Sequence, residues 1–476
     1  MVPGSWTVAR LTDLSQRLSS GHSRLDAVLG GGLWSDALTL ITGAPGTGKT
    51  LLAQQFVFAN ATPDAPALYV STVSEPLEKI LRYGRTLTFF DPDAVGRSVF
   101  YEDLGGLLDE RGLPAFVERL DAAIDERKPS MIVIDSFKAL HAFAREPSDF
   151  RWFLHDFAGR LAASGASSFW VGEYVDEDIA REPEFAVADA ILKLSSERFA
   201  ERELRVFQVL KLRGSGFMSG QHAYRLSNSG LDIFPRLADP SDPTSYDLDE
   251  RRVSSGIPAL DAMLNDGYWP GSSTLVAGPS GVGKSVMALS FVFAGAAAGE
   301  PGLIANLQEN PTQLERTARG FGWSLEAPNV HLLYRSSVDL YIDQWVHEML
   351  DVIESRGVKR VVIDSLGDLA FASPDEVRFR EYVYSLVQRC ARRGVSVLMT
   401  MEVPDLFHLA RLSESGISNM SDNVVLLQFL RGQSRITRAL TVLKTRATLH
   451  EPEIREYRIT SDGIVLGDLF ADDQAF

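Results

Sequence analysis

The sequence GAPGTGKT at residues 43–50 has the G-x-x-x-x-G-K-[ST] pattern of a loop that binds nucleotide phosphates. A second copy, GPSGVGKS, occupies residues 278–285. Glycines in such a loop let backbone N–H groups face phosphate oxygens, and the following helix points its positive end at the same anion. Two chance glycine turns would not give two full matches in equivalent contexts. The predicted phosphate-binding residues are Gly43, Ala44, Pro45, Gly46, Thr47, Gly48, Lys49, Thr50, Gly278, Pro279, Ser280, Gly281, Val282, Gly283, Lys284 and Ser285.

The last two residues of each loop have separate predicted roles. Lys49 and Lys284 are expected to reach the β- and γ-phosphates and so to take part in catalysis. Thr50 and Ser285 are expected to hold Mg²⁺ through their hydroxyl groups. The sequence therefore predicts ATP and Mg²⁺ as ligands of both loops.

The match between the two halves is longer than the loops. The segment that begins at Ser19 repeats from Ser254 at a constant offset of 235 residues, and QFVFANA after the first loop reappears as SFVFAGA after the second. A repeat of this length is a whole domain. We therefore predict a first ATP-binding domain at residues 1–240 and a second at residues 241–476, with a Pro-, Asp- and Ser-rich linker at residues 237–252.

Composition excludes several classes of protein. The 476 residues carry a net charge of −16, which is unfavourable for sequence-independent binding to nucleic acid. The single cysteine, Cys390, excludes an internal disulfide and fits a reducing compartment. The amino-terminal segment has no apolar signal-peptide core, and no stretch of about 18 apolar residues suggests a membrane span. We expect a cytoplasmic protein without a membrane or nucleic-acid partner.

Apolar segments alternate with helical ones in both halves. In the first half, LTLIT, ALYVSTV, SMIVIDS and SSFWVGEY are typical buried strands, and STLVAG, LIANLQ, RVVIDS and VSVLMTME are their counterparts in the second half. This alternation indicates parallel sheets with crossover helices. We predict an α/β fold of two tandem P-loop NTPase domains with mostly parallel central sheets.

Two aspartates end equivalent strands. Asp135 and Asp364 each follow three apolar residues and precede a serine. Ligands of such sheets bind at the carboxyl ends of the strands, where a carboxylate can hold the water shell of Mg²⁺. An aspartate at this position can also simply cap the next turn. With a phosphate-binding loop in each half, we assign Asp135 and Asp364 to the metal.

The residue that would activate water differs between the halves. Alignment of Pro76 with Pro311 places Glu309 opposite Ser74. Glu309 is positioned to orient or deprotonate the water that attacks the γ-phosphate, although a solvated turn residue is the simpler alternative. The nearest glutamate of the first half, Glu75, is one residue further on, and a one-residue shift at a strand end changes the direction of a side chain. Our hypothesis is that the first domain binds ATP but hydrolyses it slowly.

The chain resembles the KaiC family, the double-domain RecA-like ATPases of the bacterial circadian clock and their relatives. The resemblance rests on the duplicated block, on IDS in both halves, on KLRGSGF at Lys211–Phe217 and on KTRATLH at Lys444–His450. It covers nearly the whole chain and implies two tandem RecA-like P-loop NTPase domains. In that family each domain forms a six-membered ring with nucleotides between neighbouring subunits. The resemblance therefore implies a homohexamer, with a KaiB-like or signalling protein as a further partner.

The same resemblance implies further site residues. Lys211 and Arg213 would reach the γ-phosphate of the neighbouring subunit in the first ring, and Lys444 and Arg446 would do so in the second. A cation supplied by a neighbour stabilises charge in the transition state. Charged residues that guard a strand edge are the alternative. Phe321 resembles an aromatic residue that stacks near adenine, but core packing also explains it.

The chain departs from the family at two places. The clock protein has two adjacent glutamates at each water site, whereas this chain has Val73 and Ser74 in one half and Gln308 and Glu309 in the other. The clock protein phosphorylates its own adjacent Ser-Thr pair. Only a serine, Ser418, stands there in this chain, so we expect a single phosphoacceptor or, alternatively, an ordinary loop serine.

These observations favour an ATP-binding and ATP-hydrolysing hexameric switch that hydrolyses mainly in its second domain. A DNA-dependent RecA-like motor is a second candidate, because the fold hosts such motors, but no Lys- and Arg-rich run supports it. A non-catalytic scaffold stabilised by ATP is a third candidate, and Glu309 is the residue that argues against it.

Overall fold

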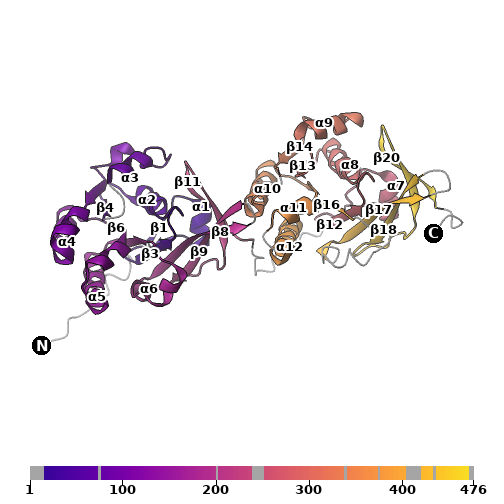
Figure 1. Ribbon diagram of the computed structural model, residues 1–476. Coiled ribbons are helices and arrows are strands. Elements are labelled where there is room, and N and C mark those ends of the chain that lie inside the picture. Colours follow the sequence, from indigo (N-terminus) through magenta and orange to yellow (C-terminus); the bar gives the residue numbers. More distant parts are fainter. Residues whose placement is uncertain are drawn as a thin grey trace. The chain divides into compact units, whose positions relative to one another are not determined.

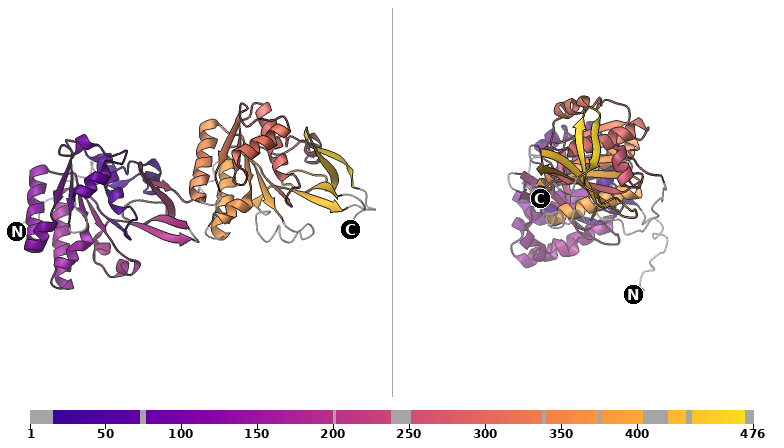
Figure 2. Two further views of the ribbon diagram at one scale, coloured as in Figure 1. Left: turned by 45° about the horizontal axis from the view of Figure 1, so that its top comes forward. Right: turned by 90° about the vertical axis from the view of Figure 1, so that its right-hand side faces the viewer.

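A nine-stranded sheet forms the centre of each of two units, Met1–Arg236 and Leu237–Phe476, and helices cover both of its faces (Figure 1). The structure is a computed structural model that describes residues 16–72, 77–199, 202–237, 251–336, 340–373, 376–403, 420–431 and 436–470. Within each unit, the strands lie between two layers of helices when the molecule is turned (Figure 2). The predicted α/β fold with mostly parallel sheets is confirmed.

The first unit has helices and strands in regular alternation. They are β1 (Arg17–Leu18), α1 (Ser23–Val28), β2 (Leu33–Trp34), β3 (Leu38–Gly43), α2 (Lys49–Asn60), β4 (Ala67–Ser71), α3 (Leu77–Gly84), η2 (Pro92–Ala94), β5 (Val99–Asp103), α4 (Gly105–Arg127), β6 (Met131–Asp135), η3 (Phe137–Phe143), α5 (Pro147–Ser164), β7 (Ser167–Gly172), η4 (Asp176–Ala180), α6 (Glu184–Val187), β8 (Ala190–Phe199), β9 (Arg202–Leu212), β10 (His222–Ser227) and β11 (Gly230–Phe234). The η elements are 3-10 helices.

The second unit repeats this order. Its elements are α7 (Pro258–Met263), β12 (Ser273–Gly278), α8 (Lys284–Ala297), β13 (Gly302–Asn306), α9 (Pro311–Gly320), β14 (Val330–Tyr334), α10 (Ile342–Arg356), β15 (Arg360–Asp364), α11 (Leu366–Phe371), α12 (Glu376–Arg392), β16 (Ser396–Glu402), β17 (Asn423–Arg431), β18 (Ile436–Lys444), β19 (Arg455–Thr460) and β20 (Gly463–Leu469).

The two sheets have the same topology. The first has the strand order β11-β10-β9-β8-β3-β7-β6-β4-β5. The second, read from the opposite edge, has the order β20-β19-β18-β17-β12-β16-β15-β13-β14, so corresponding strands occupy corresponding places. In the first sheet, all pairs from β8 to β5 are parallel, and β9, β10 and β11 add an antiparallel edge. The carboxyl ends of the parallel strands therefore meet at one edge, where ligands of such sheets bind.

Alternation of side chains along the strands builds two core layers in each unit. Ile132 and Ile134 of β6 pack on one face with Phe116 of α4, and Val133 packs on the other face with Phe56 of α2. Burial on both faces explains why these strands are continuous apolar runs in the sequence. Leu237, which the composition assigns to the linker, is buried in the core of the second unit.

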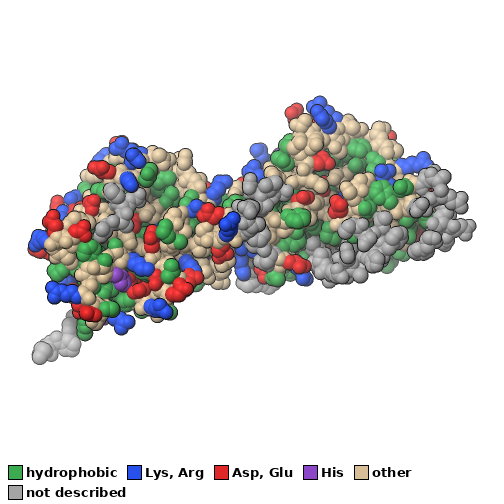
Figure 3. All heavy atoms as spheres, viewed as in Figure 1, with side chains coloured by type: hydrophobic (Ala, Val, Ile, Leu, Met, Phe, Trp, Pro, Cys, Tyr) green, Lys and Arg blue, Asp and Glu red, His purple; other side chains and the backbone are tan. Residues whose placement is uncertain are grey.

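Two surface properties bear on partners. Among the described residues, no helix combines the length and the apolar character that crossing a membrane requires. On the visible face of the first unit, Lys and Arg side chains are interspersed with Asp and Glu (Figure 3).

Candidate functional site

The first phosphate-binding loop joins the central strand β3 to helix α2. Gly48 directly precedes the helix with a left-handed φ of 92°, and a Cβ atom there would lie 2.8 Å from Cδ2 of Leu226. No side chain caps the helix, so its first N–H groups stay available to an anion. The second loop has the same form, with Gly283 at a φ of 113° before α8. The local geometry explains why glycine is needed at both positions.

The two loop lysines are folded back onto their own loops. Lys49 Nζ donates to the carbonyl oxygen of Ala44 over 2.8 Å, and Lys284 Nζ donates to those of Gly278 and Pro279 over 3.0 and 2.9 Å. Burial lowers the pKa of both ammonium groups, although carboxylates nearby oppose this effect. A bound phosphate would give each lysine a charged partner in place of a neutral carbonyl.

Carboxylates from the neighbouring strand β7 and its counterpart β16 face these lysines. Glu173 follows β7 and lies 3.8 Å from Lys49 Nζ. In the second unit, the charge of Glu402 partly offsets the lowering of the Lys284 pKa by burial. Glu173 is more than half exposed, with 57% of its side chain accessible. Equivalent strand ends thus place an acid beside the phosphate-binding lysine in both units.

The structure brings Thr50 and Asp135 together. Asp135, at the end of β6, accepts hydrogen bonds through Oδ2 from Thr50 Oγ1 over 2.7 Å and from the Tyr69 hydroxyl over 2.8 Å. Burial is the largest influence on Asp135 and raises its pKa, while both hydrogen bonds oppose the rise. Two oxygen donors side by side at the start of the loop helix fit the ligand preference of Mg²⁺.

In the second unit, Asp364 has a different partner. Its Oδ1 accepts a hydrogen bond of 2.5 Å from Thr400 Oγ1, which comes from β16. Ile304 occupies the place on β13 that Tyr69 has on β4. Ser285 is the second residue of α8, as Thr50 is of α2, and the charge of Asp364 acts on Lys284. Neither Tyr69 nor Thr400 has a functional signal in the sequence, because both resemble ordinary residues of buried strands.

Glu309 follows β13 at the carboxyl edge of the second sheet. The side-chain oxygen of Asn306 accepts the N–H groups of Gln308 and Glu309 over 2.8 and 3.0 Å, which fixes the turn. Burial raises the pKa of Glu309, and the negative charge of Asp364 raises it further. Glu309 Oε2 is buried and has no hydrogen-bond partner among the described residues. The corresponding residues of the first unit, 73–76, lie outside the described residues.

A cavity of about 1040 Å³ lies at the carboxyl edge of the first sheet. It is lined by the loop helix, by Asp135 and Glu173, and by Lys79 and Tyr83 of α3. This volume is at the upper end for small-molecule sites, so it can hold a nucleotide. Lys79 and Tyr83 had no signal in the sequence, because α3 has no recognisable motif.

Phe321 directly follows α9 in the second unit. Its ring centroid lies 5.2 Å from that of Trp323, which stacks on Phe293 at 5.1 Å and packs against the core. Phe321 itself is half-buried. Its contact with adenine stays a prediction, as does the role of Ser418, which lies outside the described residues.

The Lys-x-Arg pairs lie away from the loops of their own units. Lys211 Nζ donates to the carbonyl oxygens of Phe185 and Ala186 over 3.2 and 3.1 Å, and Arg213 Nη1 lies 3.1 Å from Asp189 Oδ1. Asp189 also accepts from the N–H of Leu38, at the start of β3. The pair is therefore at the amino end of the strand whose carboxyl end carries the loop.

The second unit repeats the arrangement. Lys444 Nζ donates to the carbonyl oxygen of Ser421 over 2.8 Å, and Arg446 Nη1 lies 3.6 Å from Asp422 Oδ1. Asp422 accepts from the N–H of Ser273, the first residue of β12. Burial lowers the pKa of Lys444, and the charge of Arg446 adds to the effect.

Comparison with known proteins identifies the family of the chain. The family described as "ATPase: KaiC" matches residues 18–238 and again residues 253–469. The chain is similar to circadian clock protein KaiC3 of Synechocystis sp., with 28% identity that covers 96% of this chain and 93% of the relative. Circadian clock oscillator protein KaiC of Thermostichus vulcanus is 30% identical, over 94% of this chain and 88% of the relative. The corresponding protein of Rippkaea orientalis is 29% identical, over 94% and 87%. With both repeats matched and a phosphate-binding loop in each, the chain belongs to the KaiC family of ATPases.

Proposed function

We propose that this chain is an ATP-regulated hexameric switch that hydrolyses ATP mainly in its second unit. The observation that supports this proposal most is the position of Glu309, beside Asp364 and with a buried oxygen that has no partner among the described residues. A carboxylate with a raised pKa is a better proton acceptor near neutral pH than an ordinary glutamate. Family membership supports ATP hydrolysis itself.

The proposed reaction is the attack of water on the γ-phosphorus. Glu309 takes the proton of the water as the new P–O bond forms, and the bond between the γ-phosphorus and the bridging oxygen breaks to release ADP and phosphate. Lys284 and the N–H groups at the start of α8 hold the phosphate charge. Ser285 and Asp364, and in the first unit Thr50 and Asp135, would hold Mg²⁺, which neutralises phosphate charge when bound.

In the first unit, we propose that ATP is bound and hydrolysed slowly. Ser74 stands where the second unit has Glu309, so the first unit has no carboxylate at that position. Asp135 already accepts hydrogen bonds from Thr50 and Tyr69, which hold it in place for a metal rather than for a proton transfer. Loss of a general base costs about 10²–10⁴ in rate.

The position of the Lys-x-Arg pairs supports action between subunits. The strand β3 separates Arg213 from the loop of its own unit. From its first to its last residue, β3 is about 17 Å long at roughly 3.3 Å per step. Arg213 and Arg446 are more than half exposed, with 59% and 57% of their side chains accessible. This exposure supports our proposal that both contact a nucleotide held by a neighbour in a closed ring, which requires a head-to-tail interface.

We propose that hydrolysis changes the surface that the ring presents to a partner, such as a KaiB-like or signalling protein. Ser418 is the proposed phosphoacceptor of an accompanying autokinase activity. Mass spectrometry after incubation with ATP should find a phosphate on Ser418 that is absent from the Lys284→Ala variant. An unmodified peptide in the wild type would remove this part of the proposal.

Phosphate release from ATP tests the main proposal. Glu309→Gln keeps the size of the side chain but cannot accept the proton, so we expect turnover to fall by about 10²–10⁴. The matched control is Glu326→Gln, which changes an exposed glutamate of the same unit and should leave turnover unchanged. Equal turnover of both variants would contradict the proposal, and no phosphate release from the wild type would support a scaffold instead.

A further inference from the structure

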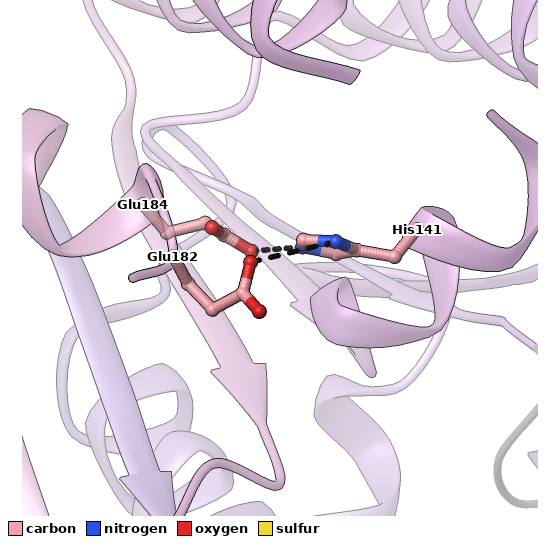
Figure 4. A group of neighbouring side chains, drawn as sticks. All are labelled: His141, Glu182 and Glu184. Carbon is pink, nitrogen blue, oxygen red and sulfur yellow. Dashed lines mark hydrogen bonds and ion pairs between the residues drawn. The ribbon is translucent and has the colours of Figure 1, made fainter. Parts of the chain in front are cut away.

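Three metal-ligating side chains of the first unit meet outside the nucleotide site. His141 belongs to η3, which begins two residues after Asp135. Glu184 is the first residue of α6, and Glu182 precedes that helix by two residues (Figure 4). One nitrogen or oxygen atom of each residue lies within 4.8 Å of the others. His141 Nε2 is 2.5 Å from Glu184 Oε1, and His141 Nδ1 is 3.7 Å from Glu182 Oε2.

Glu184 is the most informative member of the group, because its side chain has 0% exposure. Its Oε1 accepts a hydrogen bond of 2.8 Å from the Tyr174 hydroxyl, in addition to the contact with His141. Its Oε2 is buried and has no hydrogen-bond partner among the described residues. A buried carboxylate with an unsatisfied oxygen is costly, and a bound cation would remove the cost.

We propose that His141, Glu182 and Glu184 bind a divalent transition-metal ion of the Zn²⁺ class. One imidazole and two carboxylates are a ligand set that Zn²⁺ accepts, with a fourth position left for water. In a tetrahedral site, donor atoms lie about 3.3 Å apart, so the distance between His141 Nε2 and Glu184 Oε1 has to increase. Glu182 lies beside His141 Nδ1 and has to move to the Nε2 side of the ring to share the ion. The side chains of His141 and Glu182 are each 27% exposed, which allows this movement and admits the ion.

The surroundings favour a cation. The carboxylates of Glu184, Glu182 and Asp178 all act on the Tyr174 hydroxyl, which donates its hydrogen bond to Glu184. Lys138 donates a hydrogen bond of 2.5 Å to Asp178, so its positive charge already has a partner. The ring of His141 stacks on Phe150 at 3.7 Å, which holds it in position.

The fold does not require these residues. His141 follows Asp135 by six positions, and the residue six positions after Asp364 in the second unit is Ala370. Counted back from Asp422, which takes the place of Asp189, the positions of Glu182 and Glu184 correspond to Ser415 and Ile417. The three ligands therefore belong to the first unit alone.

The position of the site gives the metal a structural role. Phe185 and Ala186, which follow Glu184 in α6, provide the carbonyl oxygens that accept hydrogen bonds from Lys211. A metal would join α6 to η3. It would therefore connect the segment that follows Asp135 with the helix whose carbonyl groups hold Lys211. We therefore expect the ion to rigidify this part of the first unit.

Titration of the full-length protein with Zn²⁺ tests the proposal. The protein is first treated with EDTA and then kept in excess Mg²⁺ at pH 7.5, and binding is measured by calorimetry and by competition with a chromophoric chelator. We expect the wild type to bind one more Zn²⁺ per chain than His141→Ala, and Glu182→Gln to bind it at least tenfold more weakly. His155→Ala, which removes an exposed histidine of α5, is the matched control and should bind like the wild type.

Thermal unfolding separates a metal site from a simple ion pair between a protonated histidine and two glutamates. With a metal site, Zn²⁺ raises the Tm of the wild type and of His155→Ala but not of His141→Ala, because a ligand that binds only the native state stabilises it. Equal stoichiometry and affinity in the wild type and in His141→Ala, or a Tm without response to Zn²⁺ in the wild type, would overturn the proposal.

Discussion

At the scale of single residues, the equivalent aspartates of the two units, Asp135 and Asp364, have different surroundings. Asp135 is bonded to Thr50 and to Tyr69, whereas Asp364 accepts from Thr400 and lies close enough to Glu309 to raise its pKa. Because neighbouring carboxylates repel each other, the negative charges of Glu309 and Asp364 carry an electrostatic cost that a proton or a cation relieves. In the first unit, the two hydrogen bonds to Asp135 oppose the rise of its pKa.

The raised pKa of Glu309 predicts the pH dependence of turnover. A general base acts only when it is ionised, so turnover falls as the pH drops through its pKa. Because burial and Asp364 raise that pKa, the fall should begin at a higher pH than for an ordinary glutamate. The measurement is the rate of phosphate release between pH 5 and 8 for the wild type and for Glu309→Gln. If the remaining turnover of Glu309→Gln fell over the same pH range as that of the wild type, Glu309 would not be the group that causes the fall.

Much of this site could be predicted from the sequence, but not all of it. The constant offset of 235 residues places Glu309 opposite Ser74, and both aspartates are identified because each ends an apolar strand before a serine. It does not identify Tyr69, which reads as one more apolar residue of a buried strand. Its hydroxyl reaches Asp135 only because β4 and β6 pair in the register that puts Tyr69 opposite Val133, and that register is a tertiary property.

At the scale of elements, each loop depends on a backbone conformation that only glycine adopts easily. Gly48 and Gly283 turn the chain from the loop into α2 and α8 with left-handed φ values of 92° and 113°. The first turns of these helices then present their N–H groups to the phosphates. The sequence pattern predicts this, since its sixth position is always glycine.

Substitution of Gly48 tests the importance of that conformation. Gly48→Ala should lower the free energy of unfolding by about 1–2 kcal/mol, because a side chain disfavours left-handed backbone and would meet Leu226. The control is Gly159→Ala in the middle of α5, where an added Cβ meets nothing within 4 Å and should raise stability by about 0.5–1 kcal/mol. Denaturant unfolding of the full chain should show midpoints that move in opposite directions. A shift of both midpoints in the same direction would contradict this account.

The order of elements could also be predicted, whereas contacts between distant segments could not. Alternating strands and helices in the sequence indicate the parallel sheets, and the structure has them. The meeting of His141 with Glu182 and Glu184 has no counterpart in the sequence, because η3 and α6 are separated by α5 and β7. Only the packed sheet brings the two segments together.

At the scale of the whole molecule, the proposed mechanism of hydrolysis requires a neighbouring subunit to complete each nucleotide site. The loop and Glu309 come from one subunit, and Arg446 comes from the amino end of the central strand, at the opposite edge of the sheet. An isolated chain would therefore hold ATP but lack the cation that stabilises the transition state. Such a cation contributes about 10³–10⁵ in rate.

Mixed rings test the sharing of sites. Glu309→Gln and Arg446→Ala should each be inactive alone, but an equal mixture should regain activity at about one quarter of the interfaces, where an intact Glu309 meets an intact Arg446. The measurement is phosphate release before and after the two variants are mixed and reassembled with ATP. If Arg446 acted within its own subunit, the mixture would remain as inactive as its components.

We propose that the two units do unequal work. The initial rate of phosphate release from two matched variants, Lys49→Ala and Lys284→Ala, tests this proposal. Rates are expressed per assembled ring, so that a loss of assembly is not mistaken for a loss of chemistry. The account predicts that Lys284→Ala loses most of the turnover while Lys49→Ala keeps most of it. A ring that loses turnover with Lys49→Ala and keeps it with Lys284→Ala would contradict the account.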